Sequence, residues 1–380
     1  MLMVQVETLL ADLVALDSVS ARTNTAIIEY LERSLEGLGW RTVRLPYTAA
    51  DGVEKINLIA FAGTDSAAGP FELALVGHTD TVPYAADWTD ALRLTERDGK
   101  LYGRGACDTK GYIAAALTAL AQTDVTQLRR PLALVLTADE EIGCFGAKHL
   151  AATKALTARY AIVGEPTSLR PMRAGKGYCL ADVTVSGREG HSAYPAVGAS
   201  AIFRAARLIK ALENLSEELK NEPNGAFEPP QTTLNVGLVK GGTAKNIIAG
   251  QCRFTLEWRP VPGQRAEYVL EKLDAIIAAE KLQDADFTCE VEVLRLDGGM
   301  ETPADSPLVQ MLESATAQTA GTIAFGTEAP QMAELGAHAV VLGPGDIRVA
   351  HRTGEFVPLD ELQRCANILA QAVKHFCGGN

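Results

Sequence analysis

Short apolar segments that alternate with helical segments constrain the fold of this chain most strongly. The run Leu73–Val76 is typical of a buried strand, and similar runs recur along the first half of the sequence. Short apolar strands separated by helices imply an α/β domain with a mostly parallel sheet, covered by helices on both faces. Strands are expected near 41–45, 56–61 and 72–77 and in PLALVLTADEE and YAIVGEP, and helices near 4–16, 23–38, 111–122 and 145–153.

The pattern changes after Gly175. In Tyr178–Ser186 and in QCRFTLEW, apolar and polar residues alternate, as in strands that face water or a partner on one side. The expected order strand–helix–strand–strand–helix–strand is the split βαβ, ferredoxin-like (βαββαβ) arrangement. Because the α/β pattern resumes near the C-terminus, we expect a smaller domain (177–295) to be inserted into a larger, discontinuous one (1–176 and 296–380).

Composition excludes several classes of partner. The 380 residues include 35 Lys and Arg against 47 Asp and Glu, a net charge of −12, and no basic cluster is present. This balance argues against nucleic acid and against an anionic membrane surface. Seven scattered cysteines without a CxxC pair indicate a reducing compartment. With no basic residue before Arg22 and no apolar run that could span a bilayer, we expect a cytoplasmic protein.

Histidine and acidic side chains follow several of the expected strands. Ligands in α/β sheets bind at the carboxyl ends of the strands. Imidazole and carboxylate groups without thiolate suit zinc, cobalt or manganese. Two histidines and three carboxylates are too many for one open zinc site, but they fit a pair of ions bridged by one carboxylate. The side chains in question are His78, Asp108, either Glu140 or Glu141, Glu165 and His351.

The adjacent carboxylates of Asp139, Glu140 and Glu141 allow two interpretations. An arbitrary pair of glutamates is most often a solvated acidic turn. Here the pair follows an apolar strand, where bound cations would neutralise the repulsion. Neighbouring side chains diverge in a strand, so both glutamates face one site only where the chain leaves strand geometry. This favours different roles for the two, one as a metal ligand and one as a base.

Taken together, the motifs resemble the dinuclear-zinc amidohydrolase family, whose members include deacetylases, desuccinylases, aminoacylases and glutamate carboxypeptidases. The similarity covers almost the whole chain and consists of GHTDTVP, GRGACDTKG, TADEEIG, GEPT, GREGHSA, RPVPG and the late histidine, in that order. The resemblance implies two zinc ions, with cobalt as a possible substitute, bridged by Asp108. His78 and Glu165 would complete one site, and Glu141 and His351 the other.

Further roles follow from the same resemblance. Glu140 matches the general base, and Asp80 matches the carboxylate that orients His78. His191 matches a histidine that reaches the active site of the other subunit and stabilises the oxyanion, which implies a homodimer formed through the inserted dimerisation or lid domain. Judged without the resemblance, a lone histidine beside glycine is usually an ordinary loop residue.

Substrate contacts are implied at five positions. Lys176, Asn246 and Arg259 match residues that hold the carboxylate or carbonyl of the substrate, for which the two-pronged guanidinium is well suited. Thr327 and Glu328, in FGTEAP, could line the pocket, where Glu328 could meet an ornithine ammonium group. The alternative is that the three residues of the first group are surface charges and a strand-end arginine.

The expected reaction is hydrolysis of a small N-acyl amino acid. AGKGY, WRPVPG and FGTEAP are more similar to family members that deacetylate Nα-acetyl-L-ornithine than to desuccinylases, which usually have a GGTSDGR-type loop. We therefore expect release of ornithine and acetate, in arginine biosynthesis. The alternatives are another N-acyl-amino-acid hydrolase, such as succinyl-diaminopimelate desuccinylase or a carboxypeptidase-like relative, and a metal-free binding protein with the same fold.

Overall fold

The computed structural model describes residues 5–378, which form two compact units. Within these residues, unit 1 consists of 5–173, 302–321 and 327–378, and unit 2 of 174–301 and 322–326. The sequence-based boundaries at 176–177 and 295–296 lie a few residues from these divisions. Each unit is described separately below.

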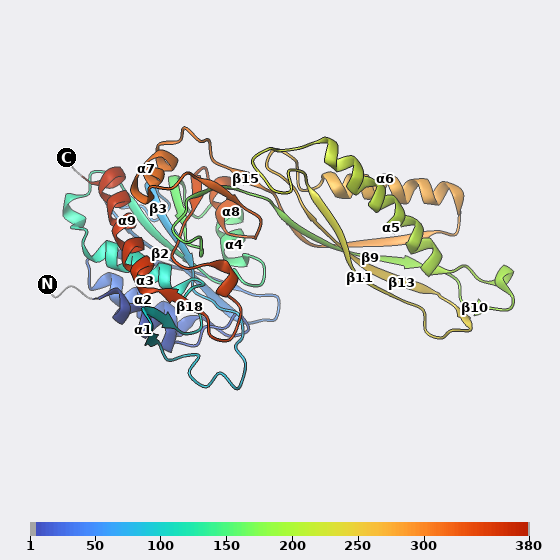
Figure 1. Ribbon diagram of the computed structural model, residues 1–380, viewed down its shortest axis with the longest axis horizontal. Helices are drawn as coiled ribbons and strands as arrows, with labels where there is room; N and C mark the ends of the chain where they lie inside the picture. Colours follow the sequence, from blue (N-terminus) through green and yellow to red (C-terminus); the bar gives the residue numbers. More distant parts are fainter. Residues whose placement is uncertain (1–4, 379–380) are drawn as a thin grey trace. The chain divides into compact units, whose positions relative to one another are not determined.

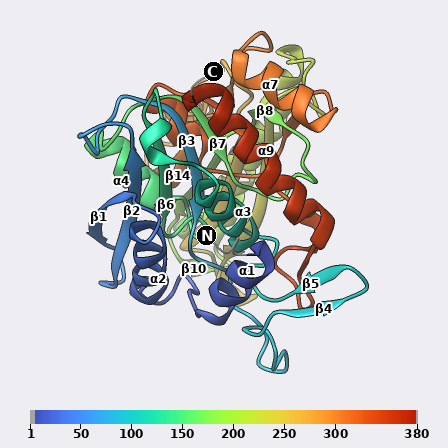
Figure 2. The same ribbon diagram turned by 90° about the vertical axis from the view of Figure 1, so that its left-hand side faces the viewer.

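Unit 1 is built on a twisted sheet with a parallel centre. Its strands follow the order β1-β2-β6-β3-β7-β17, of which the first five are labelled in Figure 2 and β2 and β3 also in Figure 1. The four central strands β6, β3, β7 and β17 are parallel, whereas β1 and β2 are antiparallel additions at one side. The predicted α/β class with a mainly parallel sheet is therefore confirmed. The bounds are β1 Arg41–Thr48, β2 Glu54–Ala62, β3 Phe71–His78, β6 Leu132–Thr137, β7 Ala158–Val163 and β17 His338–Val341.

Helices cover both faces of this sheet, because its central strands are apolar on both sides. All six residues of β6 are buried, as are ten of the twelve residues of α3, whose many alanines permit close packing against α1 and α9. These helices share one core with α2 and α7, whereas α4 and α8 lie on the other side (Figure 1). The bounds are α1 Val6–Ala15, α2 Thr25–Glu36, α3 Lys110–Ala121, α4 Phe145–Thr153, α7 Pro307–Thr316, α8 Ala329–Glu334 and α9 Leu359–Cys377.

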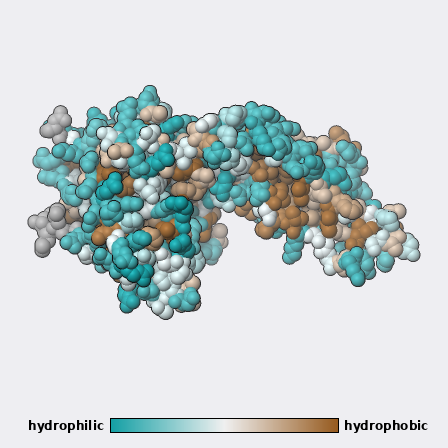
Figure 3. Space-filling view, viewed as in Figure 1, coloured by the Kyte–Doolittle hydropathy of each residue, from teal (hydrophilic) through white to brown (hydrophobic). Residues whose placement is uncertain are grey.

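Unit 2 has the predicted βαββαβ order. Its antiparallel sheet follows the order β11-β13-β9-β14 and carries α5 and α6. The alternation seen in the sequence corresponds to burial, since Phe254, Leu256 and Trp258 are buried and the residues between them are partly exposed. Apolar side chains also lie on the surface of this unit (Figure 3). The bounds are β9 Tyr178–Ser186, α5 Ala201–Glu218, β11 Thr233–Gly241, β13 Gln251–Arg259, α6 Tyr268–Gln283 and β14 Thr288–Asp297.

Several short strands were not anticipated from the sequence. They are only two to four residues long, too short to give a periodic pattern. Among residues 5–378, no helix has the length and apolar character needed to cross a membrane. None of the seven cysteines, all of which lie within the described residues, forms a disulfide. The short strands are β4 Thr95–Arg97, β5 Lys100–Tyr102, β8 Met172–Gly175, β10 Gly190–His191, β12 Ile247–Ile248, β15 Met300–Glu301, β16 Gly321–Ile323 and β18 Phe356–Pro358.

Candidate active site

The predicted metal ligands of unit 1 converge at one edge of the sheet. His78 is the last residue of β3, while Glu141 follows β6 and Glu165 follows β7. These three strands are adjacent and parallel, so their carboxyl ends meet at the same edge. His78 and Glu165 are buried, and the Glu141 side chain is almost entirely covered.

Asp108 lies between the two predicted histidine ligands. Its Oδ1 is 3.2 Å from Nε2 of His78, and its Oδ2 is 3.1 Å from Nε2 of His351. The same His351 nitrogen is 2.9 Å from Oε2 of Glu141. Each oxygen of one carboxylate thus faces a different imidazole, which is the arrangement required of a ligand that bridges two ions.

The donor atoms fall into two overlapping groups. His78, Glu140 and Glu165 form one, and His78, Asp108 and Glu141 form the other, with the potential ligand atoms of each group within 4.8 Å of one another. All the donors are imidazole nitrogens or carboxylate oxygens, a set that suits zinc and cobalt. Glu140 therefore reaches the same space as the ligands, as a base acting on a metal-bound water must.

The electrostatics of this cluster also fit bound cations. Burial, followed by the charges of neighbouring acids, raises the pKa of Glu140 to about 8 and that of Glu141 to about 7, and the pKa of Glu165 is raised as well. Oε1 of Glu141 is buried without a hydrogen-bond partner. Several carboxylates so close together in a dry site are costly when ionised, and divalent cations would remove that cost.

Asp80 has a wider role than the sequence indicated. Nδ1 of His78 is 3.0 Å from the backbone oxygen of Asp80 and 3.6 Å from its carboxylate. That carboxylate also accepts hydrogen bonds from the backbone N–H groups of Glu140 and Glu141 and from the hydroxyl of Ser20, at 3.1, 3.3 and 2.7 Å. Burial alone would raise the pKa of Asp80, but His78 and these donors outweigh it and lower the pKa. Asp80 therefore orients a histidine and also fixes the backbone of both glutamates.

Glu355 contacts the turn that carries Asp108, although the sequence did not single it out. One of its oxygens accepts hydrogen bonds from the N–H groups of Cys107 and Asp108, at 2.9 and 3.0 Å. Its other oxygen forms a buried ion pair with Arg104. Glu355 thereby ties the turn that carries Asp108 to the segment after His351. Arg104 and Glu355 each lie near a site motif, and this was the only signal in the sequence. The two residues are far apart along the chain, so the sequence did not indicate that they pair.

A thiol also contacts the predicted base. Cys144, which immediately precedes α4, donates a hydrogen bond from Sγ to Oε1 of Glu140 over 3.3 Å. The cysteine is buried and has a left-handed backbone with a φ of 55°. Nothing in the sequence distinguished Cys144 from the other scattered cysteines.

Thr327 and Glu328, the two residues of unit 1 that were predicted to line the substrate pocket, are both buried. The hydroxyl of Thr327 accepts a hydrogen bond from the N–H of Ala329 at the start of α8. Glu328 is only 1% exposed, and burial is the main cause that raises its pKa to about 7. Their role towards a substrate stays a prediction.

The other candidates belong to unit 2. His191 is exposed on β10, and Asn246 lies close by, since its backbone oxygen accepts the N–H of Ser192 at 3.1 Å. Lys176 is buried and donates from Nζ to two backbone oxygens of the 229–231 segment, each at 2.7 Å. Arg259 pairs with Glu257 at 2.9 Å. The substrate roles of these residues and the catalytic role of His191 stay predictions.

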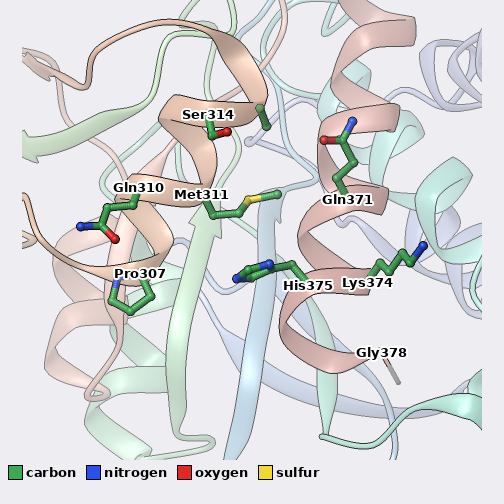
Figure 4. Close-up of a pocket in the computed structure, with 9 residues that line it drawn as sticks. Pro307, Gln310, Met311, Ser314, Gln371, Lys374, His375 and Gly378 are labelled. Carbon is green, nitrogen blue, oxygen red and sulfur yellow. The ribbon is translucent and has the colours of Figure 1, made fainter. Parts of the chain in front are cut away.

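A large cavity lies elsewhere in unit 1. It has a volume of about 950 Å³ and is lined by residues of α7 and α9, including Met311, Gln371 and His375 (Figure 4). None of the predicted site residues lines it. Size alone therefore does not locate the active site in this protein.

Comparison with known proteins agrees with this geometry. The profile of the family described as peptidase family M20/M25/M40 matches residues 74–375. A relative from Myxococcus xanthus named acetylornithine deacetylase is 54% identical over 371 residues, which cover 97% of each chain. Another of the same name, from Proteus mirabilis, is 37% identical over 96% of this chain and 93% of its own.

Solved structures show the same fold. A tripeptidase from Staphylococcus aureus superposes with a TM-score of 0.77 at 23% identity, over 98% of this chain and 99% of its own. A Bacillus subtilis protein described as a dinuclear metal-binding peptidase of the M20 family superposes with a TM-score of 0.69 at 14% identity, over 98% of each chain.

Proposed function

Because the chain belongs to peptidase family M20/M25/M40, we propose that it is a metal-dependent hydrolase that converts Nα-acetyl-L-ornithine into L-ornithine and acetate, a step of arginine biosynthesis. The substrate assignment is supported by relatives of that name that match over nearly the full chain. The observation that carries the chemistry is Asp108, whose two oxygens face two histidines close to the partly buried Glu140.

We assign two divalent cations to this site, zinc with cobalt as a substitute. His78 and Glu165 would hold one, Glu141 and His351 the other, and Asp108 both. Such ions lower the pKa of a bound water from about 15.7 towards roughly 7 and polarise the amide carbonyl.

Glu140 performs the proton transfers in this proposal. It accepts a proton from water as the water oxygen bonds to the acetyl carbon. It then gives that proton to the amide nitrogen as the C–N bond breaks, because an amine anion is a very poor leaving group. Burial keeps the pKa of Glu140 high, which suits a residue that must take up and release a proton near neutral pH.

We further propose a cytoplasmic homodimer formed through unit 2. The support is an apolar surface that includes Phe203 at the start of α5 and Leu238 on the edge strand β11, each 70% exposed. Exposed apolar side chains on an edge strand favour pairing with another chain. In such a dimer, His191 would stabilise the oxyanion in the partner's site. The absence of disulfides among the seven cysteines supports the cytoplasm as the compartment.

The experiment that tests the reaction is ornithine release by protein stripped with a chelator and then supplied with zinc or cobalt. We expect activity on Nα-acetyl-L-ornithine only after metal is restored, and little activity on N-succinyl-diaminopimelate under the same conditions. Faster turnover of the succinylated substrate would transfer the assignment to a desuccinylase. Absence of hydrolysis of either substrate, together with absence of metal binding, would indicate a binding protein.

A further inference from the structure

The backbone turn that follows β6 has an unusual conformation. Asp139 is fully buried and left-handed, with a φ of 59°, although residues other than glycine seldom adopt this region. The turn changes the chain direction just before Glu140 and Glu141. Such strained positions cluster at functional sites and persist only where the surroundings hold them in place.

Two side chains from outside the metal cluster hold Asp139. Nζ of Lys55, on β2, is 2.9 Å from its Oδ1, and the hydroxyl of Tyr47, on β1, donates to its Oδ2 over 2.8 Å. Both oxygens of the Asp139 carboxylate are thus engaged. The Lys55 and Asp139 side chains are only 1% and 0% exposed, so water screens this ion pair very little.

Lys55 also connects the turn to a second segment. Its ammonium group donates to the backbone oxygens of Ser20 and Arg22, at 2.5 and 2.6 Å, in addition to forming the ion pair with Asp139. The hydroxyl of Ser20 in turn donates to Asp80, the carboxylate that receives the N–H groups of both glutamates. The turn is therefore held through the side chain of Asp139 on one side and through Asp80 on the other.

We propose that Lys55, assisted by Tyr47, is a positioning residue of the active site. By fixing Asp139 in its left-handed conformation, it aims Glu140 at the water and Glu141 at the metal. The inference rests on the metal site of the proposed function. A buried ion pair is a poor device for stability alone, since apolar residues of similar volume often do as well. A role in placing the two glutamates accounts for the lysine at this location.

The test compares Lys55→Met and Tyr47→Phe with the wild-type protein. Its readouts are cobalt affinity by competition with a chromogenic chelator, kcat and KM for Nα-acetyl-L-ornithine, and the Tm of the metal-free protein. Loss of a group that supports a metal ligand typically costs about 10–100-fold in metal affinity or activity. We expect a loss of that size for Lys55→Met and a smaller one for Tyr47→Phe, in metal affinity and kcat, with KM little changed.

Tyr30→Phe is the matched control. It removes a tyrosine hydroxyl that donates to Asp12 over 2.9 Å, a contact between α1 and α2 that involves no site residue. Its metal affinity and kcat should stay at the wild-type level. The double variant Lys55→Met/Asp139→Asn removes both charges, so its Tm should recover relative to Lys55→Met while metal affinity stays low.

The proposal is overturned if Lys55→Met and Tyr47→Phe bind two cobalt ions as tightly as the wild type and retain kcat per folded molecule. If Lys55→Met does not fold, Tyr47→Phe decides alone, by the same criterion. The cobalt titration does not depend on the identity of the substrate. A wild-type protein that binds cobalt but leaves acetylornithine intact would therefore contradict the proposed substrate and leave the positioning role open to measurement by metal affinity.

Discussion

Glu140 and Glu141 show how neighbouring residues of one type acquire different tasks. Both are acidic, both lie after β6, and both donate a backbone N–H to Asp80. Their side chains differ in what they meet, since Glu141 contacts His351 and Glu140 contacts the thiol of Cys144. A histidine contact suits a shared metal site, whereas a weak thiol donor leaves Glu140 free to exchange a proton.

The first prediction concerns the general base. Glu140→Ala should retain two bound metal ions but lose about 10²-fold or more in kcat, because proton transfer then depends on solvent alone. Metal content by elemental analysis and steady-state kinetics on acetylornithine measure both quantities. A variant with full activity would remove Glu140 from the mechanism.

The second prediction concerns the pH dependence of the metal-free protein. In the folded state the pKa values of Glu140, Glu141 and Glu328 are raised to about 8, 7 and 7 from 4.5. Between pH 5 and 8 the folded state therefore holds more protons than the unfolded state, so stability falls as pH rises. The depressed pKa of Lys110, about 8, acts in the opposite direction only above this window.

Melting temperatures across pH 5–8 measure this effect. Chelator-treated protein should lose stability steadily over the interval, and Glu328→Gln, which does not alter a predicted ligand, should lose less. Added zinc should flatten the curve, since the cations stabilise the ionised carboxylates. A metal-free protein whose Tm rises from pH 5 to pH 8 would contradict the assignment of these buried acids.

Secondary-structure elements place the site through their ends. The parallel strands β3, β6 and β7 bring three ligand positions to one edge, while Asp108 and His351 come from loops. The contact between Glu355 and the Asp108 turn joins these loops to each other. The positions of the two predicted loop ligands, Asp108 and His351, therefore depend on the carboxylate of Glu355, to which we assign no metal ion.

The third prediction follows from that link. Glu355→Ala leaves the Arg104 guanidinium buried without its partner and should lower the free energy of unfolding by about 3–5 kcal/mol. It should also weaken metal binding, since the N–H groups of Cys107 and Asp108 lose their acceptor. Urea unfolding and a cobalt titration measure the two effects. Unchanged metal affinity would limit Glu355 to a role in stability.

The sequence predicted these elements better than the contacts between them. Apolar periodicity located the long helices and strands because burial on both faces, or on alternate residues, leaves a pattern in the sequence itself. Motif resemblance supplied the candidate ligands, such as His78 and His351, which both lie close to Asp108. It did not supply Lys55 or Glu355, because each acts through contacts with segments that are distant along the chain, and such contacts leave no local pattern.

At the scale of the whole molecule, the proposed activity depends on two copies of the chain. Unit 1 contains the predicted metal ligands and the base, but His191 belongs to unit 2. In our proposal this histidine serves the site of the other subunit, where loss of an oxyanion donor typically costs about 10²–10³-fold in rate.

The fourth prediction tests this exchange by complementation. His191→Ala and Glu140→Ala should each be nearly inactive as pure proteins. Co-expression of the two gives heterodimers in which one of the two sites has both residues intact, so about a quarter of the wild-type activity should return if dimers form at random. Sedimentation would verify the dimer. If mixing restores no activity although heterodimers are present, His191 does not act in trans.

The single carboxylate of Asp108 between two histidines also affects how ions are taken up. A metal ion bound by His78 would also bind Asp108, and it would fix the Asp108 carboxylate in the orientation that the second metal site needs. Binding of the two ions would then be coupled. Removal of the ions by a chelator would pass through a protein with one ion, which Asp108 would bind without a second ion on its other oxygen.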